Sequence, residues 1–417
     1  MTDRQRKPTD SGVLAGLKVL DLAHHYSAAF AGCLLADLGA DVTVVENPDG
    51  NVLRGMRPQK NDVSLWTTVV ERNKSNVSLR LSTPKGRELF LQLATKFDVV
   101  IENFRPGTME RWGIGPDSLA AAGADLVMLR VSGYGQTGPR SSRPGFGGAA
   151  EAMSGLSQMT GPNDGAPLLL STAIADGVAG AFGTIGVLSA LWQRSRAAAQ
   201  RVPGEPGHVE VVDIALFEAM FRLIPTQILE YDQCGSIPGR AGSVREHGVI
   251  RNIYRTADDV YFCISSVGPR AIERTLKAMQ ADDLLEQLNG DVLSSSESHV
   301  VSYVDACDQS LAKWSGSLPF ASVEAALNEA GVVFEQVYTV ADIVKDEHYL
   351  ARGDIVTVPD STLGPVRMPG IVPKFAGFQH EVRHAGVGIG VDNAAIYGEV
   401  LGLTAAQLEE LQSSGII

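Results

Sequence analysis

Short apolar runs alternate with helical patterns along the first half of the chain. Residues 17–22 and 41–46 have the composition of buried strands, and the small-residue segment 28–38 between them suits a helix that stops at Gly39. Strand, helix and strand in this order form a βαβ unit, which builds a parallel sheet with helices on its faces. The pattern therefore predicts the start of an α/β domain.

The same alternation continues to about residue 231. Thr83 can cap a helix and Pro84 suits its first turn, after which residues 87–94 show helical periodicity. The further elements that we expect are strands over 98–102, 126–132 and 208–212 and helices over 176–194 and 215–231. These elements together predict a doubly wound α/β domain.

The character of the sequence changes between residues 225 and 330. Strands near 251–255 and 260–266 precede a helix near 272–279, which predicts a smaller α+β domain. The last segment, 331–417, returns to short strands and ends in a helix. At that helix, Thr404 and Gln407 have the spacing of a capping box.

Composition narrows the classes of partner. Thirty-five basic and 48 acidic residues leave a net charge of −13, which repels the phosphates of nucleic acids and anionic membrane surfaces. We expect neither as a partner, although a few local donors can still hold a small anionic ligand. The four cysteines form no CxxC pair, which predicts free thiols. The polar leader does not suit a secretory signal peptide, and the apolar stretch 177–192 is shorter than the roughly 18 residues of a membrane-spanning helix. A cytoplasmic protein with free thiols is the expectation.

A glycine-rich string after the strand at 126–132 resembles a nucleotide fingerprint. Gly133, Gly135 and Gly138 satisfy GxGxxG, but Pro139 and Pro144 follow where the fingerprint needs a helix. We therefore interpret this segment as a flexible loop over a cleft. The histidines form no HExxH set, so no metal site is predicted.

Asp176 is an isolated charge at the start of an apolar helix. Such a carboxylate often caps the helix by accepting bonds from free backbone N–H groups. The same position also keeps a carboxylate ionised, as a nucleophile must be. The nearby Gly177, Gly180 and Gly183 leave room either for a substrate or for tight helix packing, and both interpretations stay open.

Pairs of basic residues follow several of the predicted strands. In open α/β sheets ligands bind beyond the carboxyl ends of the strands, so this recurrence suits a phosphorylated ligand. Any single arginine of this kind is more often a solvated surface residue. The pairs are Arg54 and Arg57, Arg72 and Lys74, Arg105 and Arg111, and Arg140 and Arg143, and His24 and His25 follow the first strand.

Several ordered strings together resemble the class III CoA-transferases of the CaiB/BaiF type. They are LKVLDL (17–22), LLADLGAD (34–41), NK (73–74), ENFRPG (102–107), SGYGQTGP (132–139), AD (175–176) and GPVRMP (364–369). The resemblance implies a Rossmann-like large domain made from 1–224 and 331–417, a small α+β domain over 225–330, and two subunits interlocked as a dimer. A homodimer is expected, with a heteromer containing a related subunit as the alternative.

The resemblance also implies the chemistry. Asp176 falls on the family's nucleophilic aspartate, which moves CoA from an acyl-CoA donor to a small carboxylic acid through an aspartyl-CoA thioester. Coenzyme A is then a substrate, and no permanently bound cofactor is expected. The CoA contacts implied in this way are Tyr26, Ser27, Leu79, Arg80, Asn103, Phe104, Arg105, Arg111, Gly145 and Phe146, with Leu81 and Ser82 near the adenosine and 144–147 beside the pantetheine.

Departures from the family's patterns bear on the substrate. Formyl-CoA transferases have Gln and Arg where this chain has Tyr26 and Asn47, and their glycine-rich substrate loop is missing near 240–270, so oxalate and formate are not favoured. α-Methylacyl-CoA racemases share the fold, but Phe146 replaces their histidine base. A racemase and a non-catalytic CoA-binding subunit remain the alternatives. Candidate substrate contacts are Trp66, His247 and Arg251.

Overall fold

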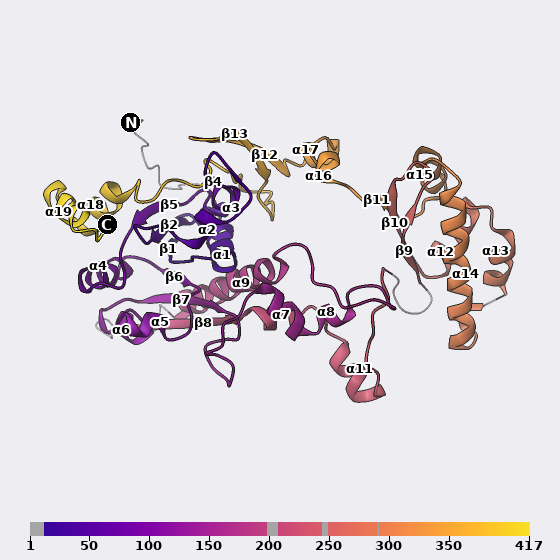
Figure 1. Cartoon of the computed structure of the whole chain (residues 1–417), viewed down its shortest axis with the longest axis horizontal. Helices are drawn as coiled ribbons and strands as arrows, with labels where there is room; N and C mark the ends of the chain where they lie inside the picture. The colour runs from indigo at the N-terminus through magenta and orange to yellow at the C-terminus, as the bar shows by residue number, and fades with distance from the viewer. Residues whose placement is uncertain (1–11, 198–206, 244–248, 291) are drawn as a thin grey trace. The chain divides into compact units, whose positions relative to one another are not determined.

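The computed structural model describes residues 12–197, 207–243, 249–290 and 292–417, and the chain divides into two compact units (Figure 1). The larger unit comprises Met1–Leu156, Leu169–Gly235 and Leu350–Ile417, and the smaller unit comprises Ser157–Leu168 and Ser236–Tyr349. Both ends of the chain therefore contribute to the larger unit.

A parallel sheet of six strands organises the larger unit. Its strand order is β5-β2-β1-β6-β7-β8, and every neighbouring pair is parallel. This is the doubly wound order, in which the chain reverses its direction of travel between β1 and β6 and ligands bind outside the carboxyl ends there. The strands are β1 (Lys18–Asp21), β2 (Asp41–Glu46), β5 (Ser75–Ser78), β6 (Val99–Glu102), β7 (Leu126–Ser132) and β8 (Val209–Ala215).

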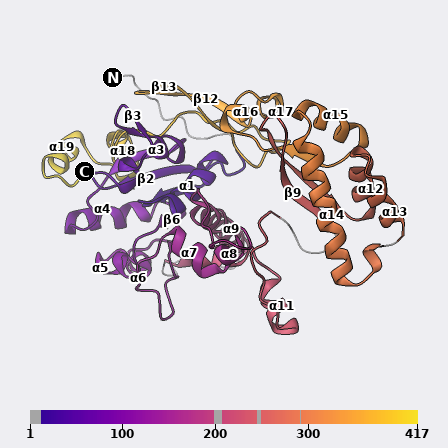
Figure 2. The same ribbon diagram turned by 45° about the vertical axis from the view of Figure 1, so that its right-hand side comes forward.

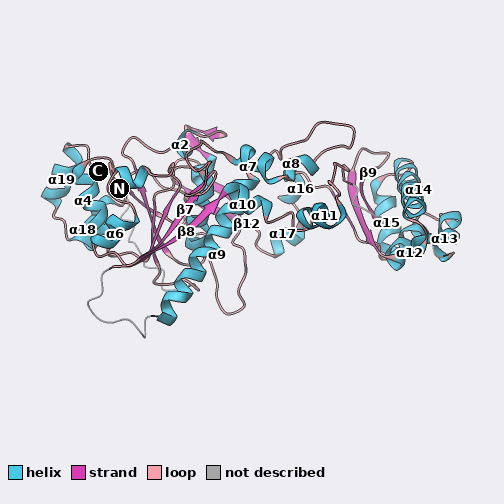
Figure 3. Ribbon diagram, turned by 90° about the horizontal axis from the view of Figure 1, so that it is seen from below, coloured by secondary structure: helices cyan, strands magenta, loops and turns pink. Residues whose placement is uncertain are grey.

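Successive residues of these strands point into two separate cores. Val19 packs in one core and Leu20 in the other, because side chains alternate between the faces of a sheet. Helices α1 and α9 lie together on the first face (Figure 2), and α9 runs along β7 and β8 (Figure 3). On the first face lie α1 (Tyr26–Asp37), α7 (Gly147–Ser154), α9 (Ile174–Ala197) and α10 (Leu216–Phe221), and on the second α4 (Pro84–Ala94), α6 (Pro116–Ala121), α18 (Asn393–Leu401) and α19 (Ala405–Ser413).

Helix α9 is long and apolar enough, by length and composition alone, to cross a membrane, but it packs against α1, β7 and β8. Its glycines make this packing possible. A Cβ atom on Gly180 would lie 2.6 Å from the backbone oxygen of Ser27, and one on Gly183 would lie 2.9 Å from Leu129 Cδ2. Of the two interpretations left open by the sequence, these two glycines serve close packing.

The carboxyl-terminal helices close the second face beside β5 (Figure 1). The Tyr397 hydroxyl donates to the Ser78 carbonyl over 2.9 Å, and the Arg80 amide donates to the Ile416 carbonyl over 2.8 Å. The larger unit also contains α2 (Val52–Gly55), β3 (Gln59–Lys60), β4 (Val63–Ser64), α3 (Leu65–Val70), α5 (Thr108–Arg111), α11 (Gln227–Cys234), β12 (Ile355–Asp360) and β13 (Gly364–Pro369). Two short helices, α8 (Leu156–Met159) and α17 (Glu347–Ala351), span the points in the sequence at which the chain passes from one unit to the other.

The smaller unit is an α+β structure built on an antiparallel sheet of order β11-β10-β9. Phe262 and Ile264 of β10 pack in its core with Leu276 and Leu311 from the helices. Its elements are β9 (Val249–Arg255), β10 (Tyr261–Val267), α12 (Pro269–Ala278), α13 (Asp282–Asn289), the 3-10 turn η2 (Val292–Ser294), α14 (Glu297–Gly316), α15 (Phe320–Ala330), β11 (Phe334–Gln336) and α16 (Val340–Ile343).

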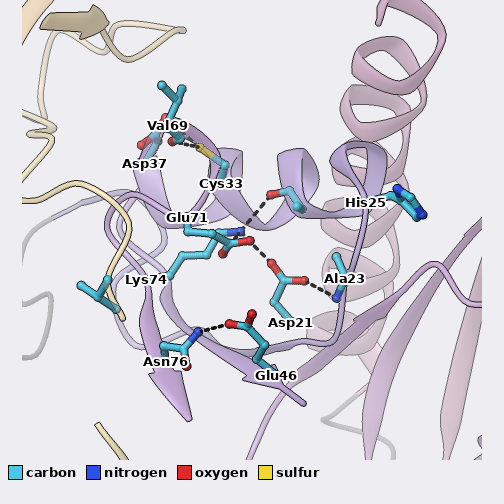
Figure 4. A network of polar contacts seen from close by, with 12 residues as sticks. Asp21, Ala23, His25, Cys33, Asp37, Glu46, Val69, Glu71, Lys74 and Asn76 are labelled. Atoms are coloured by element: carbon cyan, nitrogen blue, oxygen red, sulfur yellow. Dashed lines mark hydrogen bonds and ion pairs between the residues drawn. The ribbon is translucent and has the colours of Figure 1, made fainter. Parts of the chain in front are cut away.

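A buried ionic network lies between helix α1 and strand β1 on the first face of the sheet (Figure 4). Lys74 Nζ lies 2.7 Å from Asp21 Oδ2 and 3.1 Å from Glu71 Oε2, and it donates to the Ala29 carbonyl. Burial raises the pKa of Glu71 to about 7, against the pull of the Lys74 ammonium. Arg72 is buried too, against Asp37. The prediction that Arg72 and Lys74 belong to a ligand-binding loop is therefore wrong, because both are internal ion-pair partners.

The helix expected over 215–231 is also wrong. Two helices, α10 and α11, stand there, and Pro225 lies in the break between them. Proline lacks the amide N–H and clashes with the preceding turn, so it ends a helix. Both expected helix caps are confirmed: Thr83 Oγ1 accepts from the Gly86 amide, and Thr404 exchanges bonds with Gln407.

Candidate active site

Asp176 lies inside the first turn of α9, two residues after the helix begins at Ile174. It is therefore not at the N-cap position that was expected, although its carboxylate accepts a bond from its own backbone amide in the first turn. Its carboxylate faces the start of α7 instead: a Cβ atom on Gly147 would lie 2.5 Å from Asp176 Oδ2. A side chain at position 147 would force the carboxylate to shift, so glycine leaves room for the position that it has here.

Burial dominates the electrostatics of Asp176. Desolvation, helped slightly by the negative charge of Glu151, raises the pKa of its carboxyl to about 6, against the hydrogen bond from the residue's own backbone amide. Within the described ranges, neither a cation nor a side-chain donor is among the groups that shift it. Above pH 6 the carboxylate is thus mostly ionised and poorly compensated, which is the condition of a reactive nucleophile.

Glu151 was missed by the sequence reasoning. It is buried in α7, and its Oε2 accepts from the Leu170 amide over 3.0 Å. A signal was present, since Glu151 is the only charged residue between Arg143 and Asp164. A lone acid in a glycine- and alanine-rich segment indicates a buried position with a specific role.

Tyr26 begins α1 beside the same carboxylate. Its hydroxyl would lie 3.5 Å from a Cβ atom on Gly177, the residue that follows Asp176. Burial, the Cys33 thiol and the Asp176 charge raise the pKa of Tyr26 to about 12, so its hydroxyl keeps its proton at neutral pH. Tyr26 can therefore donate a hydrogen bond to an oxygen that reacts at Asp176.

The side-chain amide of Asn103 hydrogen-bonds the loop after β6 to the loop after β1. Asn103 Oδ1 accepts from the His24 amide over 3.1 Å, and its Nδ2 donates to the His25 carbonyl and to Ser27 Oγ. These loops follow the two strands where the sheet's winding reverses. The geometry thus places Asn103 and Ser27 at the expected ligand-binding edge, as structural partners of each other.

A cavity of about 210 Å³ lies beyond the carboxyl ends of β1, β2, β5 and β6. His24 stacks on Phe104 at its wall, with ring centroids 4.9 Å apart, and Leu79 and Trp112 add apolar surface. Burial, and to a lesser extent the neighbouring His25, lowers the pKa of His24 to about 4, so its ring is neutral at pH 7. A wall of aromatic and apolar groups suits a planar heteroaromatic ring.

Two polar atoms at this cavity lack partners in the described structure. His24 Nδ1 and Asn51 Oδ1 are both buried without a hydrogen bond, and both residues line the cavity. Buried polar groups normally find partners, so the cavity suits a ligand that carries its own polar atoms into it. A purine base has both features, and the residues present thus fit the adenine end of CoA.

Among the described residues, the predicted arginines differ in whether they form an ion pair. Arg80 pairs with Asp49 over 2.9 Å and donates to the Gly415 carbonyl, so it holds the chain's carboxyl end in place. Arg105 and Arg111 are exposed after β6, and Arg111 donates to Thr108 Oγ1. The pair that follows β6 is therefore available to an anionic ligand, whereas Arg80 is already engaged.

Gly145 and Phe146 precede α7. A Cβ atom on Gly145 would lie 2.8 Å from Gly133 Cα, so close backbone approach explains Gly133 of the earlier string, whereas Gly135 and Gly138 adopt positive φ angles. Phe146 is 65% exposed and meets the His25 ring edge-on, with centroids 5.6 Å apart. Phe146 thus borders the site as an apolar surface next to Gly147.

Two of the other candidate contacts belong to different units of the chain. Trp66 contacts Tyr26 edge-on at 4.9 Å between centroids, whereas Arg251 belongs to β9 of the smaller unit. His247 lies outside the described residues. In the part of the chain that the structure describes, no three His, Cys, Asp or Glu side chains gather as potential metal ligands.

Comparisons with known proteins identify relatives of this chain by sequence and by fold. A family model described as CoA-transferase family III matches residues 14–393. The chain is 34% identical to the succinyl-CoA–D-citramalate CoA-transferase of Chloroflexus aurantiacus over 100% of both chains. It is 32% identical to the alpha subunit of that organism's succinyl-CoA–L-malate CoA-transferase, over 97% of this chain and 92% of the relative. Among solved structures, a CAIB/BAIF family protein from Brucella suis superposes with a TM-score of 0.80 at 26% identity, covering 94% of this chain and 100% of that one.

Proposed function

The chain belongs to CoA-transferase family III, and on that premise we propose that Asp176 carries CoA covalently between two carboxylic acids. The resemblance drawn from the motifs is confirmed, and the protein is an enzyme of the class III CoA-transferases. Its mixed α/β fold with a parallel central sheet is the Rossmann-like fold that was expected.

The proposed reaction splits one difficult exchange into two halves. The Asp176 carboxylate attacks the thioester carbonyl of the donor, which forms a mixed anhydride and releases CoA thiolate. The thiolate then attacks the aspartyl carbonyl, leaving an aspartyl-CoA thioester and the free donor acid. The acceptor carboxylate attacks this thioester, and the thiolate released returns to the acceptor's carbonyl, so that acyl-CoA leaves and Asp176 is regenerated.

The observation that carries the proposal is the buried carboxylate of Asp176, which faces Gly147 and has no side-chain donor or cation as a partner among the described residues. A carboxylate that merely stabilised the fold would be paired or would cap its helix. The neutral Tyr26 hydroxyl beside it supplies a donor for the oxyanion that each attack creates, which lowers the barrier electrostatically.

CoA is bound as substrate in this proposal. The 210 Å³ cavity receives the adenine, with Leu79, Leu81, Ser82 and Phe104 at its wall. Arg105 and Arg111 face the phosphates, and Gly145 and Phe146 flank the pantetheine as it approaches Asp176. This arrangement follows the edge of the sheet at which doubly wound folds bind their ligands.

Two interlocked subunits complete the proposed enzyme. Helix α11 has no buried residue, and Ile228, Leu229 and Tyr231 on it are 60%, 61% and 62% exposed. An apolar helix surface of this kind suits a protein interface. Relatives named as alpha and beta subunits exist, so a dimer with a related second chain is the alternative to a homodimer. A cytoplasmic location is also part of the proposal.

Chemical trapping tests the mechanism. The purified enzyme is incubated with a panel of acyl-CoA donors and then with hydroxylamine, which converts an aspartyl thioester into a hydroxamate. Mass spectrometry should find the hydroxamate on Asp176, and the Asp176→Asn variant should lose both the hydroxamate and CoA transfer. Asp164→Asn, which changes an exposed aspartate, is the matched control. Transfer that survives in Asp176→Asn refutes the proposal.

The same preparation separates the alternatives. Phe146 stands where a racemase has its histidine base, and it offers no proton acceptor. Deuterium entering the α-carbon of a branched acyl-CoA, without exchange of the acid, would favour the racemase. CoA binding without either reaction would favour the non-catalytic subunit.

A further inference from the structure

A second cavity, of about 560 Å³, lies between α1 and α3 and reaches the end of β13. Tyr26 is part of its wall, and the same tyrosine approaches Gly177 with its hydroxyl. The Tyr26 ring packs on Phe30 at 5.3 Å and on Trp66 at 4.9 Å between centroids. One side chain thus borders both the proposed nucleophile and this cavity.

The wall of the cavity is almost entirely apolar. Phe30 and Leu34 come from α1, and Leu65, Trp66 and Val69 come from α3. A volume of this size lies within the range of small-molecule sites, roughly 300–1,000 Å³. Such a wall gains free energy from apolar groups and offers little to a charged one.

The ionisable groups of the wall are already engaged. Arg72 uses its Nε and one terminal nitrogen on the two oxygens of Asp37, and its other terminal nitrogen donates to the Pro369 carbonyl. The side chains of Arg72 and Asp37 are only 6% and 2% exposed. An acyl group that ended in a second carboxylate would find no unpaired cation among the lining residues.

The Cys33 thiol is the remaining polarisable group. It points at Val69 and Asp37 (Figure 4), 3.8 Å from the Val69 carbonyl oxygen. Burial raises the pKa of Cys33 to about 12, so the thiol is neutral at physiological pH and behaves as a small apolar group. It adds no charge to the cavity.

We propose that this cavity receives the acyl group and selects apolar monocarboxylic acids, branched aliphatic or aryl, over dicarboxylic ones. The inference rests on the proposed function, because the acyl carbon must reach Asp176 past Tyr26. It sets this chain apart from its relatives, which are named for the dicarboxylic substrates succinyl-CoA, malate and citramalate. Each methylene added to a donor should raise kcat/KM about fourfold until the cavity is full.

Donor competition tests the selectivity. Butyryl-, hexanoyl-, isovaleryl-, phenylacetyl- and succinyl-CoA are compared with one acceptor, and kcat/KM is measured for each. The proposal expects the apolar donors to exceed succinyl-CoA by at least tenfold. A succinyl-CoA value equal to or above the apolar donors, together with hydroxamate on Asp176, would overturn the cavity assignment and leave the mechanism standing. No transfer with any donor would instead reject the proposed function itself.

Two substitutions at Val69 change the room in the cavity in opposite directions. Val69→Phe should shift the preferred donor to a shorter acyl chain, and Val69→Ala should shift it to a longer one. CoA affinity should stay within twofold of the unsubstituted enzyme in both, which also shows that the variants fold. An unchanged preference for acyl-chain length in both folded variants would contradict the proposal. A change of oligomeric state without a change of this preference would also contradict it, because a segment of the partner subunit would then occupy the cavity.

A gain of charge provides an independent test. Leu65 is 37% exposed at the cavity wall, so Leu65→Arg can bring a guanidinium to it without a buried charge. The ratio of succinyl-CoA to hexanoyl-CoA turnover should rise at least fivefold. Val340→Arg, at a position 74% exposed in the smaller unit, is the matched control and should leave the ratio unchanged. An unchanged ratio in Leu65→Arg would count against the cavity as the acyl site.

Discussion

Asp176 combines two properties that favour reactivity over stability. It is partly withdrawn from water, and no cation compensates its charge within the described residues. An ionised group in this position destabilises the folded state. A protein keeps such a group where its chemistry requires it, at a cost in stability. The residue should therefore reveal itself in the pH dependence of stability as well as in activity.

Replacing Asp176 by Asn should stabilise the protein at neutral pH. The pKa of the carboxyl rises from 3.8 unfolded to about 6 folded, so the folded state binds the extra proton between these values. The contribution of this carboxyl to the free energy of unfolding of the wild type is therefore fully present below pH 3.8 and is lost as the pH rises through 6. Urea unfolding should show Asp176→Asn more stable by about 1–3 kcal/mol at pH 8, with the gain shrinking toward pH 4.5.

Either of two results would contradict this account of Asp176. A gain independent of pH would mean that the amide makes new bonds. A wild type more stable than the variant at pH 8 would mean that the carboxylate is compensated after all. Both outcomes would weaken its assignment as the nucleophile.

Gly147 tests the fit around the carboxylate. Gly147→Ala places a methyl group 2.5 Å from Asp176 Oδ2, so the carboxylate must move. We expect kcat to fall at least a hundredfold, since a misplaced nucleophile loses its alignment, while CoA affinity changes little. Gly148→Ala, which meets only Leu169 Cδ1 at 3.3 Å, is the control, and equal activity of the two variants would be inconsistent with the site.

At the scale of elements, periodicity predicted most of the parallel sheet. β1, β2, β6 and β7 are buried on both faces and read as continuous apolar runs, which are easily recognised. The edge strand β5 was not predicted, because its sequence Ser-Asn-Val-Ser carries polar side chains, and those of Asn76 and Ser78 accept hydrogen bonds from the carboxyl-terminal segment. Contacts from distant parts of the chain decide such a strand, and a local pattern cannot show them.

The ionic network links these elements, and Lys74 is its centre. Lys74→Met leaves Asp21 and Glu71 buried without their shared cation, which should cost about 3–5 kcal/mol in unfolding free energy. Urea denaturation at pH 7.5 measures the loss. Lys85→Met removes a surface pair with Glu88 and should cost less than about 1 kcal/mol. Equal costs for the two variants would show that the buried network contributes no more than a surface pair.

At the scale of the whole molecule, the sequence motifs predicted the family, which the local patterns could not do. The site residues that the resemblance implies stay a prediction: Tyr26 lines one cavity of the larger unit, Phe104 lines the other, and Asp176 lies in the first turn of α9. Nothing in the spacing indicated that Lys74 is buried or that Glu151 lies near Asp176. These positions depend on how distant segments pack, which one sequence does not reveal.

The exposed surface of α11 predicts an assembly. Replacing Leu229 and Tyr231 together by Glu should disrupt the interface, since charge is then buried against an apolar partner. Light scattering should give twice the chain mass of 44.3 kDa for the unsubstituted protein and less for the variant. Gln233→Glu on the same helix controls for added charge. An unsubstituted protein that is monomeric at micromolar concentration would refute the interlocked dimer.

Transfer of oxygen tests the covalent mechanism most directly. The enzyme is first charged with CoA from an apolar donor and is then given one equivalent of an acceptor acid whose carboxylate carries ¹⁸O. If Asp176 is the carrier, its regenerated carboxylate gains one heavy oxygen, which peptide mass spectrometry detects at that residue alone. Complete formation of the new acyl-CoA with unlabelled Asp176 would mean that the acids exchange CoA without it, and the central claim would be wrong.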